Sequence, residues 1–294
     1  MSTNSRRTRR IGGWLPADQT ELKNWVRTLV ERVKANPTPL SPVVQDFKTL
    51  VQNDPELYML FNEMLTQVPS KYIDDPSGVP EVRDIDTLFQ VFNQLIQEAP
   101  TYNTSPQVGT PINAVLDWPM GTTAGFAAFL KDNVNAQFKK MLQAWGQFLT
   151  TPASCATLTT NPLSGWFNKA KLHSGVLADF AVVFECNPLE PHYGYTSWDA
   201  YFTRRFWPMI RPVAYPDDDS YIVNACEAAA FNWQENVNLL DTFWIKAQPY
   251  SLAHMMNNDP NAKLFVGGTV YQGFLSATSY HRWHAPVSGK IVSA

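Results

Sequence analysis

Two histidines late in the sequence have the residue type and spacing to support chemistry. His281 and His284 lie in the stretch TSYHRWHAPVSG, residues 278–289. Histidine changes its charge near neutral pH and is also a common metal ligand, so the pair indicates proton transfer or metal binding. Pro286 follows closely and disfavours a helix at this point. We therefore expect both histidines to lie in a turn.

Spacing alone leaves three interpretations of this pair open: catalysis, a zinc site and ordinary packing. Zinc needs a third protein ligand, and no other His or Cys lies at motif spacing, so zinc is the weakest of the three. The other histidines have no local acid or nucleophile pattern, which favours structural roles for His173, His192 and His254. The sequence also has no Gly-rich phosphate loop and no GxSxG elbow.

The composition argues against several classes of protein. A net charge of −3 gives no overall basic field for nucleic acid. No window approaches the ~18 uninterrupted apolar residues of a membrane span, so we expect no transmembrane anchor. Three widely spaced cysteines predict neither a disulfide framework nor a metal knuckle, and they favour the cytoplasm. These are Cys155, Cys186 and Cys226.

Residues 1–20 form a separate basic segment, which we interpret as a disordered tail. Its stretch NSRRTRR carries four arginines and no acidic residue. The same composition is typical of a short transit peptide, which leaves the mitochondrion as the alternative location.

Residues 21–165 are predicted to form a helical domain. Apolar residues recur at intervals of three and four, which is typical of helices that bury one face. Two of these segments open with cap signatures, Ser41 before Pro42 and Asp54 before Pro55. Loops rich in Pro, Thr and Ser separate the later segments. The predicted helices cover residues 22–36, 41–53, 54–65, 84–99 and 133–149.

The character of the sequence changes after these helices, and residues 166–294 are predicted to be mainly β. Segment 195–213 is expected to be a helix capped by Thr196 or Ser197, with an apolar stripe that reaches Phe206. A short helix is expected at 250–258. The fold class is therefore α+β, with a second domain whose last strand has no closing signal, as if truncated. The predicted strands cover residues 221–225, 228–233, 242–247, 269–275 and 290–294.

Three segments of the second half together resemble the phosphatidylserine decarboxylase family, whose members are pyruvoyl-dependent and self-cleaving. SWDAYFTRRFWPMIRPV is similar to the family's helix with its Phe-x-x-Arg and Arg-Pro elements. IKAQPYSLAHMM is similar to its Lys-Gly-x-x-Tyr-Ser-Leu segment, with Ala247 where Gly is usual. GTVYQGFLSATSYHRWHAPVSG is similar to its Tyr-His-Arg-x-His-x-Pro-x-x-Gly motif. The resemblance covers about residues 190–294, and the helical first half is similar to the extension of soluble fungal members, which include tryptophan decarboxylases.

This resemblance implies a carboxy-lyase that acts on an aromatic L-amino acid or on phosphatidylserine. It assigns His284 as the base for a self-cleaving serine, and His281 to proton handling beside the substrate. Serine attack on the preceding peptide carbonyl leaves a covalent pyruvoyl group, which takes up electrons from the breaking C–CO₂ bond. A carboxylate normally holds such a base in the useful tautomer.

The sequence departs from the family pattern in two places. In NACEAA, Cys226 stands at the usual Asp position and Glu227 at the usual Gly. We expect Glu227 to supply the orienting carboxylate; the alternative is that this acid is lost. No Gly-Ser-Ser-type cleavage motif is present, which implies that the chain alone is inactive and that its partner is a missing C-terminal pyruvoyl-bearing segment. The alternative function is a non-catalytic remnant that binds or regulates a full-length relative.

Overall fold

A computed structural model describes most of the chain, and all statements below concern the described residues. These are residues 20–74, 78–103, 109–168, 179–240, 243–245, 248–276 and 278–291. Residues 1–19 of the predicted tail, His173 and residues 292–294 of the last predicted strand lie outside them. The chain divides into two compact units, residues 1–170 with 189–201, and residues 171–188 with 202–294. The domain boundary expected at residue 165 stays a prediction.

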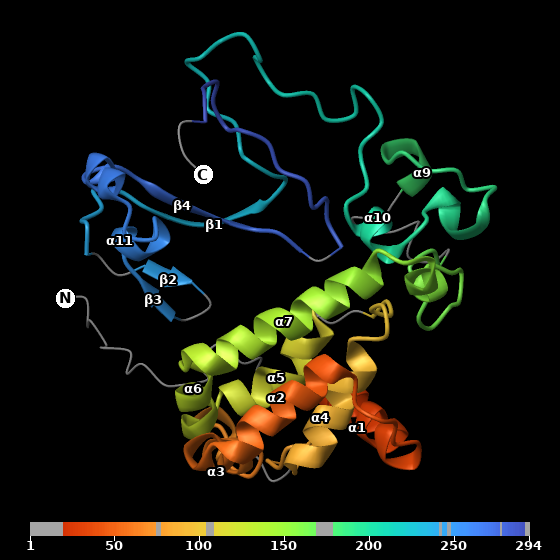
Figure 1. The fold of residues 1–294 in the computed structure, drawn as a ribbon. Helices are drawn as coiled ribbons and strands as arrows, with labels where there is room; N and C mark the ends of the chain where they lie inside the picture. The colour runs from red at the N-terminus through yellow and green to blue at the C-terminus, as the bar shows by residue number, and fades with distance from the viewer. Residues whose placement is uncertain are drawn as a thin grey trace. The chain divides into compact units, whose positions relative to one another are not determined.

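The first unit is helical, and the five helices predicted for it are confirmed (Figure 1). Two further helices, α5 (Pro111–Met120) and α6 (Thr123–Phe129), are not evident in the sequence pattern. Helix α5 buries residues nearly all along its length, so it shows no polar face and no amphipathic stripe. The predicted helices are α1 (Thr20–Ala35), α2 (Pro42–Asn53), α3 (Pro55–Met64), α4 (Ile85–Leu95) and α7 (Asp132–Leu149).

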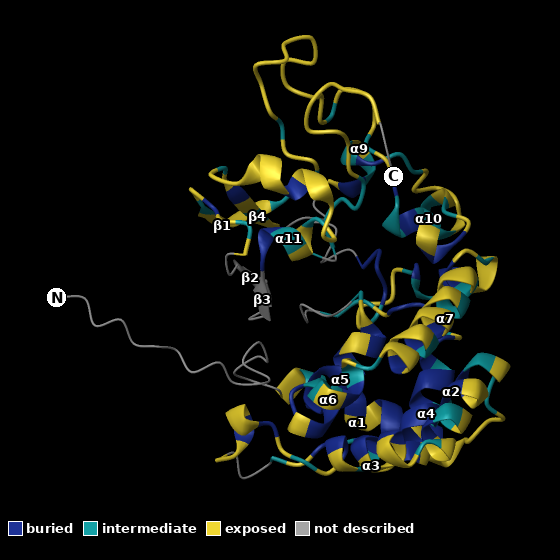
Figure 2. Ribbon diagram, turned by 60° about the vertical axis from the view of Figure 1, so that its left-hand side comes forward, coloured by how far each residue is buried: buried dark blue, intermediate teal, exposed yellow. Residues whose placement is uncertain are grey.

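The core of the helical unit is built around aromatic rings. Phe47 of α2 is fully buried, and its ring centroid lies 4.8 Å from that of Phe138 and 5.4 Å from that of Phe89. Phe61 and Phe92 also contact it, at 5.9 and 6.5 Å. Edge-to-face and stacked ring pairs at these distances add to the free energy of apolar burial. Figure 2 shows the buried residues on the inward faces of α2 and α4.

The two predicted N-caps behave differently. Asp54 accepts hydrogen bonds from the backbone N–H groups of Glu56 and Leu57, so it caps α3 as expected. Ser41 occupies the N-cap position of α2, but its side chain makes no capping hydrogen bond. Its hydroxyl oxygen is buried and has no hydrogen-bond partner. The position predicted for Ser41 is therefore confirmed, whereas the capping bond is absent.

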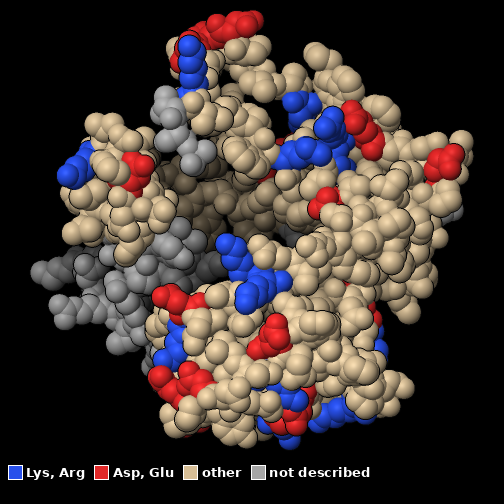
Figure 3. Space-filling model, in the orientation of Figure 1, with Lys and Arg blue, Asp and Glu red and all other residues tan. Residues whose placement is uncertain are grey.

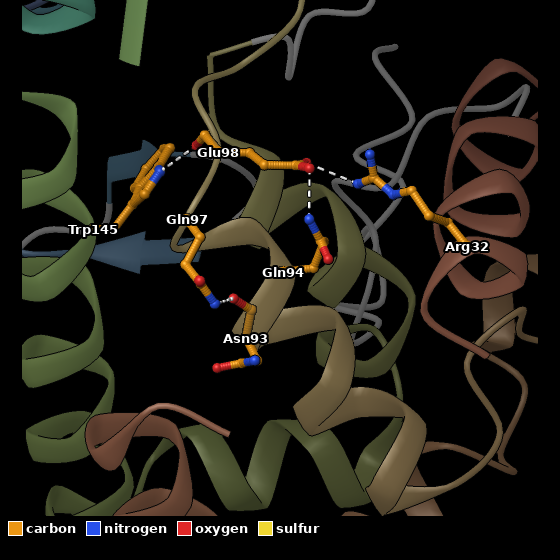
Figure 4. Close-up of polar contacts among 6 residues, drawn as sticks. All are labelled: Arg32, Asn93, Gln94, Gln97, Glu98 and Trp145. Carbon is orange, nitrogen blue, oxygen red and sulfur yellow. Dashed lines mark hydrogen bonds and ion pairs between the residues drawn. The ribbon is translucent and has the colours of Figure 1, made fainter. Parts of the chain in front are cut away.

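Glu98 links three helices of this unit (Figure 4). Its carboxylate accepts hydrogen bonds from Arg32 of α1 at 2.7 Å and from Gln94 of α4 at 2.6 Å. Its backbone carbonyl accepts a hydrogen bond from the indole N–H of Trp145 on α7 at 2.9 Å. The Arg32–Glu98 pair is partly exposed, so it contributes less than about 1 kcal/mol and mainly fixes geometry.

The helix predicted over 195–213 is much shorter in the structure. Helix α10 covers Trp198–Phe202, and Phe206 lies beyond it in an extended segment. The N–H of Glu185 donates to the carbonyl of Arg205, and the N–H of Trp207 donates to the carbonyl of Val183. These hydrogen bonds to residues 183–185 pair backbone groups that a longer helix would have paired within itself. The predicted helix is therefore wrong after Phe202.

The second unit is a mixture of short elements, which confirms the α+β class in its coarse form. Strand β1 (Ala229–Gln234) pairs antiparallel with β4 (Val270–Phe274), with a register irregularity at Phe231 (Figure 1). Strand β2 (Phe243–Ile245) pairs antiparallel with β3 (Gln248–Tyr250). The short helices are α9 (Phe180–Val183) and α11 (Leu252–Met255), the second as predicted. Among the described residues of both units, 3-10 turns cover Ser70–Tyr72, Pro152–Thr157, Pro191–Gly194 and Pro260–Phe265.

The strands predicted at 221–225 and at 290–291 are not strands in the structure. Residues 223–225 instead run beside residues 284–286, joined by two backbone hydrogen bonds. Neither segment continues this pairing far enough to form a regular ladder. Val223 and Ala225 of the predicted strand are therefore hydrogen-bonded to the segment that carries His284.

Charged side chains of both signs lie on the face of the helical unit seen in Figure 3, where acidic and basic groups are interspersed. In the part of the chain that the structure describes, no helix combines the length and the apolar character needed to cross a membrane.

Candidate active site

An open cleft of about 800 Å³ lies within the second unit. Its lining joins residues from three stretches that are far apart in the sequence: 206–214, 223–229 and 274–284. The groups that could do chemistry or bind a small molecule include His284, Glu227, Arg211, Arg282, Phe206 and Tyr280.

Backbone hydrogen bonds place His284 in this cleft. Its N–H donates to the carbonyl of Ala225 at 2.9 Å, and the N–H of Val223 donates to the carbonyl of Pro286 at 3.1 Å. These bonds bring His284 beside the segment that carries Glu227. The His284 side chain is exposed, and the surrounding chain is a loop. The expected turn-like, non-helical setting of the histidines is therefore confirmed.

Glu227 lines the same cleft but has another partner. Its Oε1 accepts a hydrogen bond from Nε of Arg211 at 2.6 Å, and this ion pair is about half exposed. The Arg211 guanidinium also lies over the ring of Phe206, 5.5 Å from the centroid. Among the described residues, no hydrogen bond joins the Glu227 carboxylate to the His284 ring. The role expected for Glu227 as the orienting acid stays a prediction.

His281 has a different environment. Its ring stacks on that of Phe202, with centroids 4.0 Å apart and an interplanar angle of 21°. Tyr280, its neighbour, stacks on Phe206 with centroids 3.9 Å apart. The two histidines of the motif thus have separate surroundings, one against an aromatic ring and one in an open cleft.

Sequence reasoning missed the arginines of this region. Arg211 and Arg282 line the cleft, and Arg204 is buried and is not part of its lining. Arg204 and Arg211 belong to the segment with the Phe-x-x-Arg and Arg-Pro elements, and Arg282 stands between the two histidines. Their place in family-like motifs was a usable signal, whereas their long-range partners were not visible in the sequence.

All three cysteines are free thiols. Cys226 lines the cleft next to Glu227, and burial raises the pKa of the Cys186 thiol to about 11. Within the described ranges, no group of three or more His, Cys, Asp or Glu side chains could hold a metal ion.

Comparisons with known proteins identify related sequences for both halves of the chain. Two family models, both described as phosphatidylserine decarboxylase, match residues 41–174 and 198–294. The L-tryptophan decarboxylases of Psilocybe cyanescens and Psilocybe cubensis are 35% and 33% identical, each over 95% of this chain. Decarboxylase iboD of Amanita muscaria is 43% identical over 62% of this chain and 53% of its own length.

The matches extend over both units, including the cleft and both histidines. The chain spans 64% of the length of the two Psilocybe relatives. The two family models together include α2 to α7 and the whole histidine motif, so the match does not rest on a short local pattern. This chain belongs to the phosphatidylserine decarboxylase family and is similar, over nearly all its length, to fungal L-tryptophan decarboxylases.

Proposed function

We propose that this chain supplies the histidine-bearing part of a pyruvoyl-dependent decarboxylase that acts on an aromatic L-amino acid. The observation that carries this proposal is the cleft in which His284, Glu227 and Arg211 lie with the rings of Phe206 and Tyr280. A guanidinium suits a substrate carboxylate, and aromatic rings suit an aromatic side chain. Aromatic amino acids carry both features.

The names of the relatives support this choice of substrate. The two fungal proteins that match 95% of this chain are called L-tryptophan decarboxylases. Phosphatidylserine, the substrate in the name of the family models, is the alternative. Three free thiols suit a reducing compartment, so the proposed location is the cytoplasm.

The cleft also fits a pyruvoyl group. Its volume of about 800 Å³ falls within the range of small-molecule sites, about 300–1,000 Å³. The side chains of His284 and Arg282 carry N–H groups that can donate hydrogen bonds to a carbonyl oxygen. Once formed, a pyruvoyl group supplies an electron sink for the bond to the departing CO₂.

The residues of this chain would act through protons and charge. In the proposal, a ring nitrogen of His284 accepts the hydroxyl proton of the serine that becomes the pyruvoyl group. Glu227 has a second carboxylate oxygen besides the one that contacts Arg211, and this oxygen would hold the His284 ring in one tautomer. His281, stacked on Phe202, would handle protons beside the substrate.

The partner in this proposal is a C-terminal pyruvoyl-bearing segment, and two observations support it. The chain spans 64% of the length of its Psilocybe relatives. Strands β1 and β4 form a two-stranded ribbon, which is marginally stable by itself in water. Large side chains on this ribbon are exposed, Phe231 at 72% and Trp233 at 65%. A covering segment would bury them.

The test is to fuse this chain to the part of the Psilocybe cyanescens relative that it does not match. Mass spectrometry then detects self-cleavage, and CO₂ release is measured from L-tryptophan, L-phenylalanine, L-tyrosine and phosphatidylserine vesicles. The variant His284→Ala should stop cleavage, and Glu227→Gln should slow it by up to about 10⁴-fold. His254→Ala, which changes a histidine that does not line the cleft, is the matched control and should cleave normally.

Each outcome bears on a definite part of the proposal. Cleavage with CO₂ release from an aromatic amino acid supports it. Release from phosphatidylserine alone replaces the substrate. A folded fusion that neither cleaves nor releases CO₂ refutes the catalytic role and favours a binding or regulatory partner.

A further inference from the structure

Arg204 is buried and binds the backbone of the residues that precede the two histidines in the sequence. Its side chain is 2% exposed, and its guanidinium lies 4.4 Å from the ring centroid of Phe184 and 5.5 Å from that of Phe180. Its Nη2 donates to the backbone carbonyls of Thr278 and Ser279, at 2.9 and 3.0 Å. A buried arginine that binds carbonyl groups fixes their position more firmly than a neutral donor would.

A second arginine makes the reverse contact between the same two segments. Nε of Arg282 donates to the backbone carbonyl of Thr203 at 2.6 Å. Residues 203–204 and 278–282 are thus joined in both directions, each by an arginine side chain and a backbone carbonyl. We call this arrangement the arginine clamp.

Two ring pairs enclose the clamp. Phe202 stacks on His281, and Phe206 stacks on Tyr280. The aromatic residues therefore lie on either side of Thr203 and Arg204 in one segment, and they meet consecutive residues of the other. A shift of the 278–282 backbone would break the arginine contacts and both stacks together.

We propose that Arg204 is a positioning residue that fixes the loop of residues 278–284, and with it the His281 ring, through the carbonyls of Thr278 and Ser279. The importance of these histidines rests on the proposed function, but the positional effect does not. It can therefore be measured on the 294-residue chain without any catalytic assay.

The experiment records the ring resonances of His281 by NMR, assigned with a His281→Gln variant, together with amide exchange at Ser279 and His284. Stacking on Phe202 should displace the His281 ring protons upfield. Arg204→Met should remove this displacement and speed exchange at both N–H groups by about tenfold or more. The matched control is Arg205→Met, which removes the neighbouring exposed cation and should leave both readouts unchanged.

A stability effect alone would give a different result. If Arg204 only supports folding, the folded Arg204→Met protein keeps the displaced His281 signals and the slow exchange, and the proposal is wrong.

If Arg204→Met does not fold, Arg204→Lys decides. Lysine keeps the charge, but its side chain is shorter and lacks the planar guanidinium that lies against Phe184, so exchange should still rise about tenfold. Unchanged exchange in folded Arg204→Lys would overturn the proposal. The two proposals can fail separately. If Arg204→Met changes the His281 signals and the amide exchange as expected but the fusion releases no CO₂, the proposed function is wrong and the positioning role stands.

Discussion

Two serine-to-alanine changes in the helical unit should have very different effects on its stability. Ser154 is fully buried, and its hydroxyl contacts the carbonyls of Leu149 and Thr151 at 2.9 and 2.7 Å. The same oxygen accepts a hydrogen bond from the backbone N–H of Trp198 at 2.8 Å, where α10 begins. Ser41, by contrast, has a buried hydroxyl oxygen with no hydrogen-bond partner.

The magnitudes follow from what each change leaves behind. Ser154→Ala deprives a buried N–H of its acceptor, which costs about 1–3 kcal/mol, and it also loses the hydrogen bond that the hydroxyl donates, about 1 kcal/mol. We expect a total of about 2–4 kcal/mol. Ser41→Ala removes a hydroxyl that gains nothing from burial, so we expect a change within about 0.5 kcal/mol.

Urea unfolding followed by the helix signal in circular dichroism measures both changes. With a slope of about 2 kcal/mol per molar urea, Ser154→Ala should lower the midpoint by about 1 M or more, and Ser41→Ala should barely move it. The general rule for N-cap serines predicts a loss of about 1 kcal/mol for Ser41→Ala. That loss, or a midpoint for Ser154→Ala equal to that of the wild type, would refute the reasoning.

Three further predictions concern single groups. Phe47→Ala should destabilise the helical unit by about 3–5 kcal/mol in urea unfolding, because it removes a ring that meets four others, whereas exposed Leu130→Ala should change it by less than about 1 kcal/mol. Burial, opposed by Lys23, Arg27 and Arg83, raises the pKa of Glu81 above 4.5. The folded protein therefore binds this proton more readily than the unfolded chain. The contribution of Glu81 to the free energy of unfolding falls as the pH rises from about 4.5 through the raised pKa. Glu81→Gln should remove that fall, which urea unfolding at several pH values measures. In a variant with Cys186 as the sole cysteine, iodoacetamide should react appreciably only as the pH approaches about 11, and fast reaction near pH 8.5 would contradict the burial seen here.

The sequence predicts elements well where one residue pattern decides the structure. The stripes of α1 to α4 and α7 have the helical period, and Asp54 before Pro55 marks a helix start without help from tertiary contacts. Helix α5 cannot be predicted in this way, because nearly all its residues are buried and the sequence shows no apolar stripe of helical period. The segment after Phe202 has helical periodicity, yet its backbone pairs with residues 183–185, and no local pattern records that choice.

The histidine site shows the same division between local and distant information. Its turn-like setting follows from Pro286, and the motif singles out His281 and His284 from five histidines. The partner of Glu227 is Arg211, which lies 16 residues earlier in the chain. No residue pattern near Glu227 predicts this pairing. The arginine clamp likewise joins residues 74 to 79 positions apart.

The ion pair of Arg211 with Glu227 sharpens what the proposed chemistry requires. An orienting acid acts beside an imidazole as a carboxylate, and in the structure the Glu227 carboxylate is bound to the Arg211 guanidinium. The same pair is about half exposed, so water screens it and it contributes little energy. His284, which the proposal assigns as the base, is also exposed to water. Both groups would become effective once water is excluded, because electrostatic interactions strengthen in a medium of lower dielectric constant. The covering segment of the proposed function would provide that change, and the fusion therefore tests the electrostatics of the cleft as well as the presence of the serine.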